Sequence, residues 1–417
     1  MKRSLLGLLL ATLLACGVET ATSTEEIRAP DRDEPAANAP RPAPGGDETK
    51  KTPAEPLPPA FDDERLAPFF EEKMKAARVP GMAAAVVKGG TVRWSHGYGL
   101  ADIASKRPVT SDTLFMLASV SKPVNATALL TLLADPTRNV KLDDPIDAHL
   151  PFSVRNPRFT SVPITFRMLL THTSSLIDGA DFGNETVLGD AAMPLATWVQ
   201  NYVRRSANWS ASRPGTSWSY SSSATALAGL LVERISGMNL QDYCKKAVFE
   251  PLSMNESSWF LKGLDPSHIA LPYDDDESGG FFTKGHHGYP DYPDGQLRTS
   301  APQLARFVAM LLQRGEVDGK RVLPQASADE MRRVQHPDIS QEQALSLYWD
   351  SIDETKVLGH NGADTGVSTD MWLDPAKNVG FVLLTNGTLY LDDNPPESEI
   401  EAMYDMNRKL LELAHAL

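Results

Sequence analysis

The sequence predicts an α/β fold in which the N- and C-terminal segments build an antiparallel sheet, flanked by helices, with a large, mostly helical subdomain between them. Strand-like segments occur near both ends of the chain, and a mostly helical middle runs from about residue 120 to residue 345. With 417 residues and 41% hydrophobic composition, the chain can also bury a sizeable core. Strands at both ends around a helical body favour one sheet covered by helices.

The first 16 residues have the pattern of an export signal. Met1-Lys2-Arg3 is positively charged, residues 5–14 form an apolar run too short to cross a bilayer, and Leu13-Leu14-Ala15-Cys16 ends that run. This pattern resembles a bacterial lipoprotein signal, in which the chain is cut before Cys16 and the thiol carries a lipid. Gly17 then favours sorting to the outer membrane, facing the periplasm. The alternative is an ordinary secretory peptide cut at a small residue nearby.

Residues 17–60 are expected to form a disordered tether. The stretch has no aromatic residue, its apolar content is mostly alanine, and prolines recur along it. Such a composition buries too little surface to offset the entropy lost on ordering. The function is therefore assigned to residues 61–417.

Hydrophobic spacing places the elements of this domain. Leu66, Phe69, Phe70 and Met74 recur at helical intervals, and Gly89-Gly90 separates two strand-like runs. In chain order we expect a helix at 64–78, strands at 82–87 and 91–98, strands at 367–373 and 380–386, and a closing helix at 400–417.

Ser119 is the candidate nucleophile. It lies where a strand-like segment ends and the apolar helix 124–133 begins, and Lys122 follows it by three residues. Residues three apart share one face of a helix, so this spacing puts an amine beside a hydroxyl. Free N–H groups at the helix start would stabilise an alkoxide. The alternative reading is an N-cap serine followed by a solvated lysine.

Two later segments can supply further groups to a cleft. Tyr220 lies in a turn just before a second apolar helix that ends at Gly237, although a buried aromatic with a satisfied hydroxyl would fit the same stretch. His360-Asn361-Gly362 precedes a C-terminal strand, and its glycine allows a backbone to pass close to a ligand.

In this order, Ser-x-x-Lys, Tyr-x-Ser and His-x-Gly resemble the serine β-lactamase and penicillin-binding-protein superfamily. The likeness is greatest to its class C β-lactamase, D-Ala-D-Ala carboxypeptidase and family VIII esterase branch. It covers roughly residues 62 to 415. Segments outside the three motifs that also resemble this branch are 79–81, 107–110, 164–174, 250–254 and 383–386.

The resemblance implies roles for several residues. Ser119 would be the nucleophile, and Lys122 and Tyr220 would share the proton transfer, with the choice of base left open. Their pKa values would need to be lowered by proximity and partial burial. Backbone N–H groups of Ser119 and Ala363 would hold the oxyanion, Ala363 lying on an edge strand after Gly362. No metal or organic cofactor is implied.

Two departures from the family pattern bear on the substrate. His360-Asn361-Gly362 stands where β-lactamases of this type have Lys-Thr-Gly, and a histidine carries little charge at neutral pH. Ser222 stands where Tyr-x-Asn would supply an amide, and a hydroxyl has shorter reach and fewer donors. Both favour an esterase or peptidase over an efficient β-lactamase.

Other polar residues receive a structural interpretation. Ser121 is expected to pack or cap, His172 to be a satisfied buried histidine rather than a catalytic one, and Cys244 to act as a small buried hydrophobe. A solvated loop is favoured over a metal site for Asp274-Asp275-Asp276 and His286-His287. For three aromatic residues the sequence leaves cleft and core open: Tyr289, Tyr292 and Trp349.

The sequence thus predicts a secreted, lipid-anchored serine hydrolase that works through an acyl-enzyme. Its substrate is expected to be a small molecule or short peptide carrying an ester or a D-amino-acid-type amide, with weak β-lactamase activity secondary. A net charge of −14 argues against nucleic acid as a partner, and a monomer is expected. The alternative function is a penicillin-binding-like sensor of peptides or β-lactams that is acylated without turnover.

Overall fold

The computed structural model describes residue 58 and residues 61–276, 279–390 and 395–417. The predicted signal at 1–16 with Cys16, and the predicted tether at 17–60 apart from Pro58, lie outside the described residues. Within the described ranges, no helix combines the length and apolar character needed to cross a membrane.

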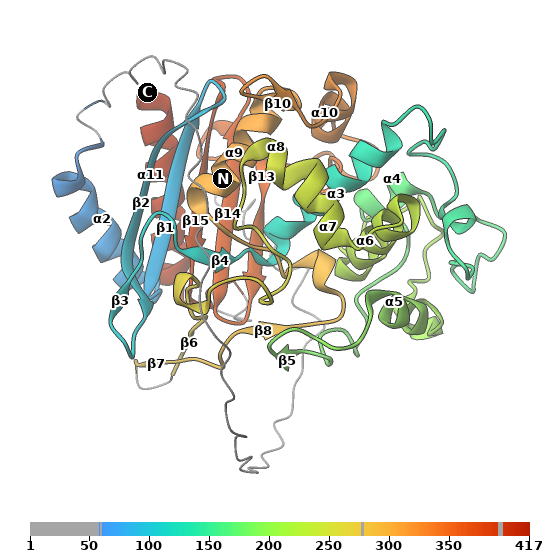
Figure 1. Cartoon of the computed structure of the whole chain (residues 1–417), viewed down its shortest axis with the longest axis horizontal. Helices are drawn as coiled ribbons and strands as arrows, with labels where there is room; N and C mark the ends of the chain where they lie inside the picture. The colour runs from blue at the N-terminus through green and yellow to red at the C-terminus, as the bar shows by residue number, and fades with distance from the viewer. Residues whose placement is uncertain (1–57, 59–60, 277–278, 391–394) are drawn as a thin grey trace, which may run out of the picture.

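A seven-stranded antiparallel sheet forms the centre of the domain, as expected from the two chain ends (Figure 1). Its first strands pair directly with its last: β1 lies beside β15, with Ala84 opposite Leu383. In spatial order the strands are β12 (Tyr348–Ile352), β13 (Thr355–Asp364), β14 (Val367–Asp374), β15 (Val379–Thr385), β1 (Gly81–Lys88), β2 (Thr91–Asp102) and β3 (Arg107–Pro108).

Both faces of the sheet are buried. Side chains alternate along β1, so Ala83 and Ala85 face one hydrophobic core while Ala84 and Val86 face another. The second core is covered by α2 (Asp63–Ala76) and α11 (Glu397–Ala416), which lie together on one side of the sheet (Figure 1). On the opposite face, α9 (Ala301–Leu312) packs against β1 and β15. The helices predicted at 64–78 and 400–417 are therefore confirmed.

The middle of the chain forms the predicted helical subdomain beside the sheet (Figure 1). Its helices are α3 (Ser121–Leu133), α4 (Phe166–Leu170), α5 (Leu195–Val203), α6 (Ser222–Ser236), α7 (Leu240–Cys244), α8 (Glu250–Leu252) and α10 (Gln325–Arg332). Helix α6 begins at the N-cap Ser221 and ends at Gly237, which adopts a φ of +74°. This confirms the helix end expected at Gly237.

Short strand pairs cross this middle region. The sequence indicated a strand-like segment before Ser119 but did not predict the pairings. They are β4 (Leu114–Met116) with β9 (Arg298–Ser300), β5 (Val187–Leu188) with β8 (His287–Gly288), β6 (Asp274–Asp275) with β7 (Phe281–Phe282), and β10 (Glu316–Val317) with β11 (Lys320–Arg321). Pairing of β4 with β9 joins the segment before Ser119 to the start of α9.

Candidate active site

Ser119 lies in a tightly held turn between β4 and α3. A short 3₁₀ turn, Ala118–Val120, leads into the helix, and Ala118 adopts a φ of +47°, which is uncommon for a residue with a side chain. Leu117 is held from both sides, because its N–H donates to Leu297 O at 2.8 Å and its carbonyl accepts from Thr369 Oγ1 at 2.7 Å. Ala118 and Val120 are buried, whereas Ser119 is partly exposed. The turn therefore presents one hydroxyl to solvent.

Lys122 reaches the Ser119 hydroxyl, as its spacing predicts. Lys122 Nζ lies 2.9 Å from Ser119 Oγ and donates to the backbone carbonyl of Asp294 at 2.7 Å. The lysine is 1% exposed. An amine this buried, with these two partners, is a fixed part of the site, which rules out the alternative of a solvated surface charge.

Tyr220 joins the same cluster from the turn before α6. Lys122 Nζ lies 5.2 Å from the centre of the Tyr220 ring. That ring packs against His172 on one side, with ring centres 4.6 Å apart, and its centre lies 6.1 Å from that of His360. Ser119 and Tyr220, about a hundred positions apart in the chain, thus both lie beside the Lys122 amine, and their catalytic roles remain predictions.

The expected lowering of the Lys122 pKa is wrong. Burial acts to lower it, but the charge of the Tyr220 oxygen, the Asp294 carboxylate, a hydrogen bond with Tyr220 and the Asp178 carboxylate together raise the pKa above its ordinary value. Proximity to Tyr220 therefore stabilises the ammonium form of Lys122 rather than the free amine.

His172 is a satisfied buried histidine, as predicted. Its Nδ1 accepts a hydrogen bond from the Ser221 N–H at 3.1 Å, so the neutral ring carries its proton on Nε2. Burial lowers the pKa of His172 to about 3, with the Lys122 charge adding to the effect. The neutral His172 ring therefore packs against the Tyr220 ring without adding a charge.

Strand β13 brings a backbone against Ser119. A Cβ built on Gly362 would lie 2.5 Å from Leu117 O, 2.5 Å from Thr369 Oγ1 and 3.0 Å from Ser119 N. Only glycine fits this close approach. Ala363 follows Gly362 directly in β13, and its role as an oxyanion donor remains a prediction.

The expectation that Ala363 lies on an edge strand needs correction. Strand β13 is second in the sheet, between β12 and β14. Strand β12, however, pairs only with residues 355–359 of β13, whereas β14 pairs along residues 358–364. Since β12 stops short, the half of β13 that carries Gly362 and Ala363 has one side unpaired within the described sheet.

His360 is uncharged in this site. The residue is buried, and burial together with the Lys122 charge lowers its pKa to about 3. This agrees with the expectation that the position contributes no positive charge. Its neighbour Asn361 is partly exposed and accepts a hydrogen bond from the Tyr348 hydroxyl at 2.8 Å.

Two carboxyl groups that the sequence did not single out surround Ser222. Asp178 accepts from the N–H groups of Ser222 at 2.8 Å and Ser223 at 2.9 Å, at the start of α6. Asp294 is 6% exposed, and its Oδ1 is buried without a hydrogen-bond partner among the described residues. Burial raises the pKa of Asp294 to about 7 despite the nearby Lys122. Because Asp178 and Asp294 are far from Ser222 in the sequence, no local motif predicts that these residues meet.

The other candidate residues have structural roles. Ser121 Oγ accepts from Leu297 N–H at 3.2 Å, which confirms its packing role, and Cys244 is fully buried as predicted. Tyr292 is buried and donates to Glu233 at 2.9 Å, and Trp349 Nε1 donates to the Arg332 carbonyl at 3.0 Å. These partners belong to helices α6 and α10.

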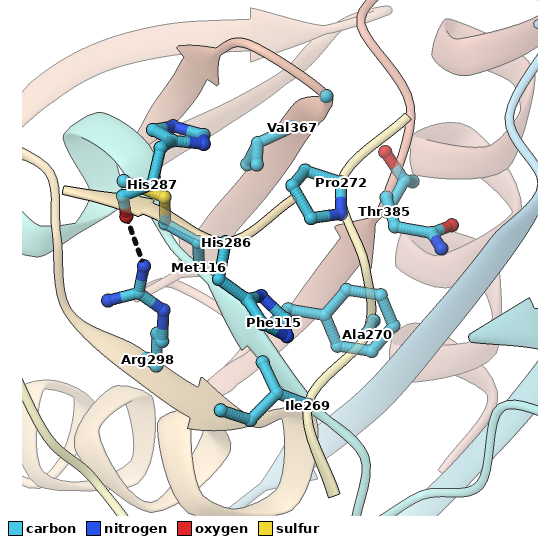
Figure 2. A pocket seen from close by; sticks show the side chains of 12 residues that line it. Phe115, Met116, Ile269, Ala270, Pro272, His286, His287, Arg298, Val367 and Thr385 are labelled. Carbon is cyan, nitrogen blue, oxygen red and sulfur yellow. Dashed lines mark hydrogen bonds between the residues drawn. The ribbon is translucent and has the colours of Figure 1, made fainter. Parts of the chain in front are cut away.

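A small enclosed cavity beside β4 is not a substrate pocket (Figure 2). Phe115, Met116, His286 and Arg298 line part of it, and its volume of about 10 Å³ is at the lower limit for one water molecule. Arg298 points to the His287 carbonyl and donates to it at 2.6 Å. In the part of the chain that is described, no group of three or more His, Cys, Asp or Glu side chains is placed to hold a metal ion.

The family of the chain follows from comparison with known proteins. The family model described as Beta-lactamase matches residues 66–402. Esterase EstB of Burkholderia gladioli is 33% identical over 218 residues, which are 51% of this chain and 54% of that protein. Protein flp of Staphylococcus aureus strain N315 is 23% identical over 323 residues, which are 78% of this chain and 63% of that protein. The matches thus span less than two thirds of these relatives.

Solved structures show the same fold. An octameric penicillin-binding protein homologue from Pyrococcus abyssi has a TM-score of 0.67 and 25% identity, over 83% of this chain and 77% of that one. D-amino acid amidase from Ochrobactrum anthropi has a TM-score of 0.67 and 22% identity, over 84% and 97%. Because the family model covers most of the chain, the protein belongs to the Beta-lactamase family, within the serine β-lactamase and penicillin-binding-protein superfamily.

Proposed function

We propose that this protein is a serine hydrolase that cleaves esters or D-amino-acid-type amides through an acyl-enzyme on Ser119. The observation that carries the proposal is the 2.9 Å contact between Lys122 Nζ and Ser119 Oγ, with the Tyr220 ring beside the same amine. A hydroxyl becomes an effective nucleophile when an adjacent group takes its proton.

In the proposed acylation, Ser119 Oγ forms a bond to the substrate carbonyl carbon and loses its proton. That proton passes to the Lys122–Tyr220 pair, in which the Lys122 amine contacts both the Ser119 hydroxyl and the Tyr220 ring, and the choice of base within the pair is left open. The carbonyl oxygen becomes an oxyanion facing the N–H groups of Ser119 and Ala363. The leaving group then takes the proton, and water later releases the acyl group.

The charges around Ser119 favour substrates without a carboxylate next to the scissile bond. His360 is neutral, and the carboxyl groups of Asp178 and Asp294 lie near enough to Lys122 to raise its pKa. An anionic substrate would therefore gain little attraction from the His360 position. The name of the relative EstB, an esterase, points the same way. We accordingly place β-lactams second.

The test is release of p-nitrophenol from a short acyl ester, measured for wild type, Ser119→Ala, Lys122→Ala and Tyr220→Phe. Ser267→Ala, at an exposed serine of the same domain, is the control and should keep the wild-type rate. We expect kcat to fall about 10²–10⁴-fold in Tyr220→Phe, the range for a lost general base, and further in Ser119→Ala.

Equal rates in wild type and Ser119→Ala would remove the nucleophile assignment. A stoichiometric burst with no later turnover would instead favour the sensor function. Parallel assays with a D-Ala-D-Ala peptide and a penicillin rank the substrate classes.

We also propose that the mature protein is a periplasmic, outer-membrane lipoprotein anchored through Cys16. The residues at 1–16 support this as a signal pattern. Incorporation of labelled palmitate in a bacterial host should be lost in Cys16→Ser. Equal labelling of both proteins would contradict the anchor.

A further inference from the structure

Three polar side chains, one buried and two partly buried, form a cluster beside Ala363 that the proposed mechanism does not use. His287 Nε2 lies 3.3 Å from Asp364 Oδ1, and the Tyr289 hydroxyl donates to Asp364 Oδ2 at 3.1 Å. The His287 side chain is only 5% exposed and that of Asp364 is 21% exposed. The Asp364 carboxylate thus receives one bond at each oxygen from a loop 75 or more residues away.

This cluster contacts the two backbone segments that carry the expected oxyanion donors, the turn at Ser119 and the strand end at Ala363. Asp364 directly follows Ala363 in β13. Tyr289 packs against the small apolar group formed by Met116, Ala118 and Val367, and Ala118 directly precedes Ser119. A single side chain, Tyr289, therefore contacts the backbone turn that carries the nucleophile and bonds the strand end that carries Ala363.

The fit around Tyr289 leaves no spare room. A Cβ on Gly295 would lie 2.2 Å from the Tyr289 hydroxyl and 3.5 Å from the carbonyl carbon of Ala118. The loop itself is fixed, because Tyr289 N–H donates to Gln296 Oε1 at 2.7 Å and Arg298 donates to the His287 carbonyl at 2.6 Å. Since Gln296 and Arg298 are buried, the cluster is anchored independently of β13.

We propose that His287, Tyr289 and Asp364 are positioning residues that hold the backbone N–H groups of Ser119 and Ala363 at the spacing an oxyanion needs, and that the His287–Asp364 ion pair makes this spacing depend on pH. The inference rests on the proposed function, because it assumes that these N–H groups stabilise an oxyanion. None of the three side chains is placed in contact with substrate.

The pH dependence has a defined sign. Burial acts to lower the pKa of His287, but the Asp364 charge and hydrogen bond outweigh it and raise the pKa above the ordinary value. In turn the pKa of Asp364 is lowered, in spite of burial, by His287. The ion pair is therefore intact below the raised pKa of His287 and is lost as the pH rises through it.

Three neighbouring groups do not titrate in this window. Burial lowers the pKa of His286 to about 4, with Arg298 adding to the effect, so this neighbour is neutral. Arg298, although its pKa is lowered by burial, remains a cation behind His287. Tyr289 has its pKa raised by burial and by Asp364, so the phenol keeps its proton and donates. Asp294 also faces Asp364 from the site, and because burial raises its pKa to about 7, this carboxyl group does titrate within the assay range. The alkaline fall is therefore assigned to His287 by its loss in His287→Gln.

The test compares four variants of the full chain with wild type: His287→Gln, Asp364→Asn, Tyr289→Phe and His415→Gln. His415 supplies the matched control, because its Nε2 lies 3.0 Å from Asp374 Oδ2 in a similar pair formed by helix α11 and strand β14. We measure kcat and KM for a p-nitrophenyl ester from about pH 5 to about pH 10, together with the rate at which a fluorophosphonate labels Ser119.

We expect His287→Gln and Tyr289→Phe to lower kcat about 10-fold to 100-fold, less than loss of a whole oxyanion donor, with KM changed less than about threefold. Wild-type kcat should fall on the alkaline side, His287→Gln should lack this fall, and Asp364→Asn should move it to lower pH. In Tyr289→Phe the decrease of kcat at alkaline pH should occur at the same pH as in wild type. His415→Gln should match wild type in both kcat and its pH dependence.

Wild-type kcat and an unchanged alkaline fall in His287→Gln would overturn the positioning role. If the variants lose activity only in proportion to lost folded protein, measured by circular dichroism, the cluster is structural and the proposal is wrong. Failure of wild type itself to hydrolyse the ester or to be labelled at Ser119 would instead overturn the proposed function.

Discussion

The close approach of Gly362 to the Ser119 turn makes a side chain at this position a direct probe of the site. In Gly362→Ala the new methyl group would meet Leu117 O, Thr369 Oγ1 and Ser119 N at 2.5 to 3.0 Å. Strand β13 would have to move away from the nucleophile, and a misplacement of about 1 Å can cost about 10²-fold in rate. We expect kcat for ester hydrolysis to fall by about that factor.

Gly380→Ala is the matched control for this substitution. Its Cβ would also be crowded, lying 2.7 Å from Val308 Cγ1 and 2.9 Å from Trp372 O, but in β15, away from Ser119. This variant should lower thermal stability while the folded fraction keeps its kcat. A normal kcat in Gly362→Ala would show that β13 does not need to approach the nucleophile so closely.

At the scale of single residues, the sequence predicted the groups that share a short local motif. Ser119 and Lys122 are three positions apart, and helical spacing alone brings them together at 2.9 Å. Asp178 and Asp294 could not be predicted in this way. Asp178 binds the Ser222 N–H 44 residues away and Asp294 O binds Lys122 172 residues away, so only the tertiary fold brings these groups together.

The direction of the Lys122 pKa was missed for a related reason. Burial was foreseeable from the apolar helix around it, and burial alone would lower the pKa. The carboxylates of Asp294 and Asp178 come from distant loops. Together with Tyr220 they outweigh burial and raise the pKa of Lys122.

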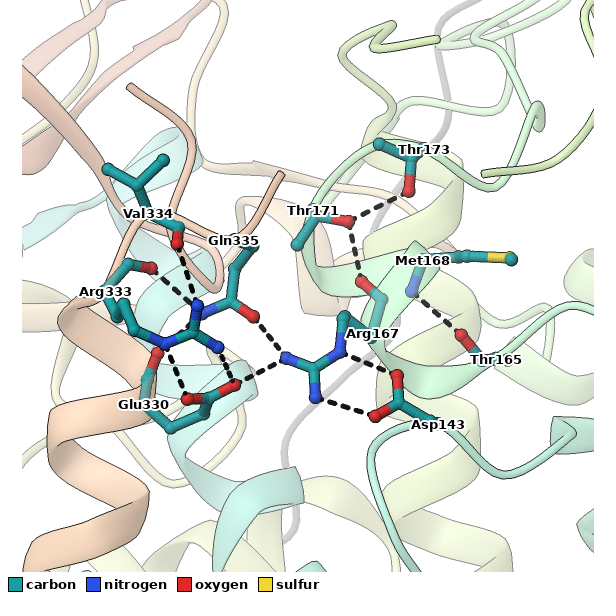
Figure 3. Close-up of polar contacts among 10 residues, drawn as sticks. All are labelled: Asp143, Thr165, Arg167, Met168, Thr171, Thr173, Glu330, Arg333, Val334 and Gln335. Carbon is teal, nitrogen blue, oxygen red and sulfur yellow. Dashed lines mark hydrogen bonds and ion pairs between the residues drawn. The ribbon is translucent and has the colours of Figure 1, made fainter. Parts of the chain in front are cut away.

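At the scale of elements, Arg167 ties α4 to α10 and to the loop before α4 (Figure 3). Arg167 points between two carboxylates: it donates to Asp143 through Nε at 2.7 Å and Nη2 at 2.8 Å, and to Glu330 at 2.6 Å. It also donates to Gln335. Because the Arg167 side chain is 17% exposed, this network is worth more than an ordinary surface pair.

We expect Arg167→Ala to lower the free energy of unfolding by about 2 kcal/mol, between the values for exposed and buried ion pairs. Urea denaturation measures it. The control is Arg205→Ala, which breaks a 2.6 Å pair with Asp181 that is 48% and 58% exposed and should cost less than about 1 kcal/mol. Equal losses in both variants would contradict a special role for the Arg167 network.

The sheet was predicted where strands carry an apolar pattern and missed where they do not. Strands β1, β14 and β15 are almost continuously buried, and their apolar residues made them visible. Strands β12 and β13 mix aromatic, charged and glycine residues, and part of β13 approaches the Ser119 turn. The glycine that the site requires at position 362 thus interrupts the apolar pattern by which a strand is predicted from sequence.

At the scale of the whole molecule, buried histidines should make the fold sensitive to acid. His172 and His360 have pKa values near 3 in the folded state, below the value of about 6.5 in an unfolded chain. The unfolded state therefore binds more protons, and stability present above about pH 6.5 is lost as the pH falls towards 3.

Each of the two histidines should contribute a loss of about 1.4 kcal/mol per pH unit within that window. Urea denaturation at several pH values measures the slope, which should be shallower by about this amount in His172→Gln. The control is His268→Gln, at a side chain that is 55% exposed. An unchanged slope in His172→Gln would show that the buried ring does not resist protonation.

The measurement that tests the account most directly is time-resolved intact mass, with peptide mapping, after mixing the protein with an acyl ester. We predict a single acyl adduct on Ser119 that forms and then decays, is absent in Ser119→Ala, and forms far more slowly in Lys122→Ala. An adduct on a different residue, or the same adduct in Ser119→Ala, would contradict the convergence of Ser119, Lys122 and Tyr220 as the source of catalysis.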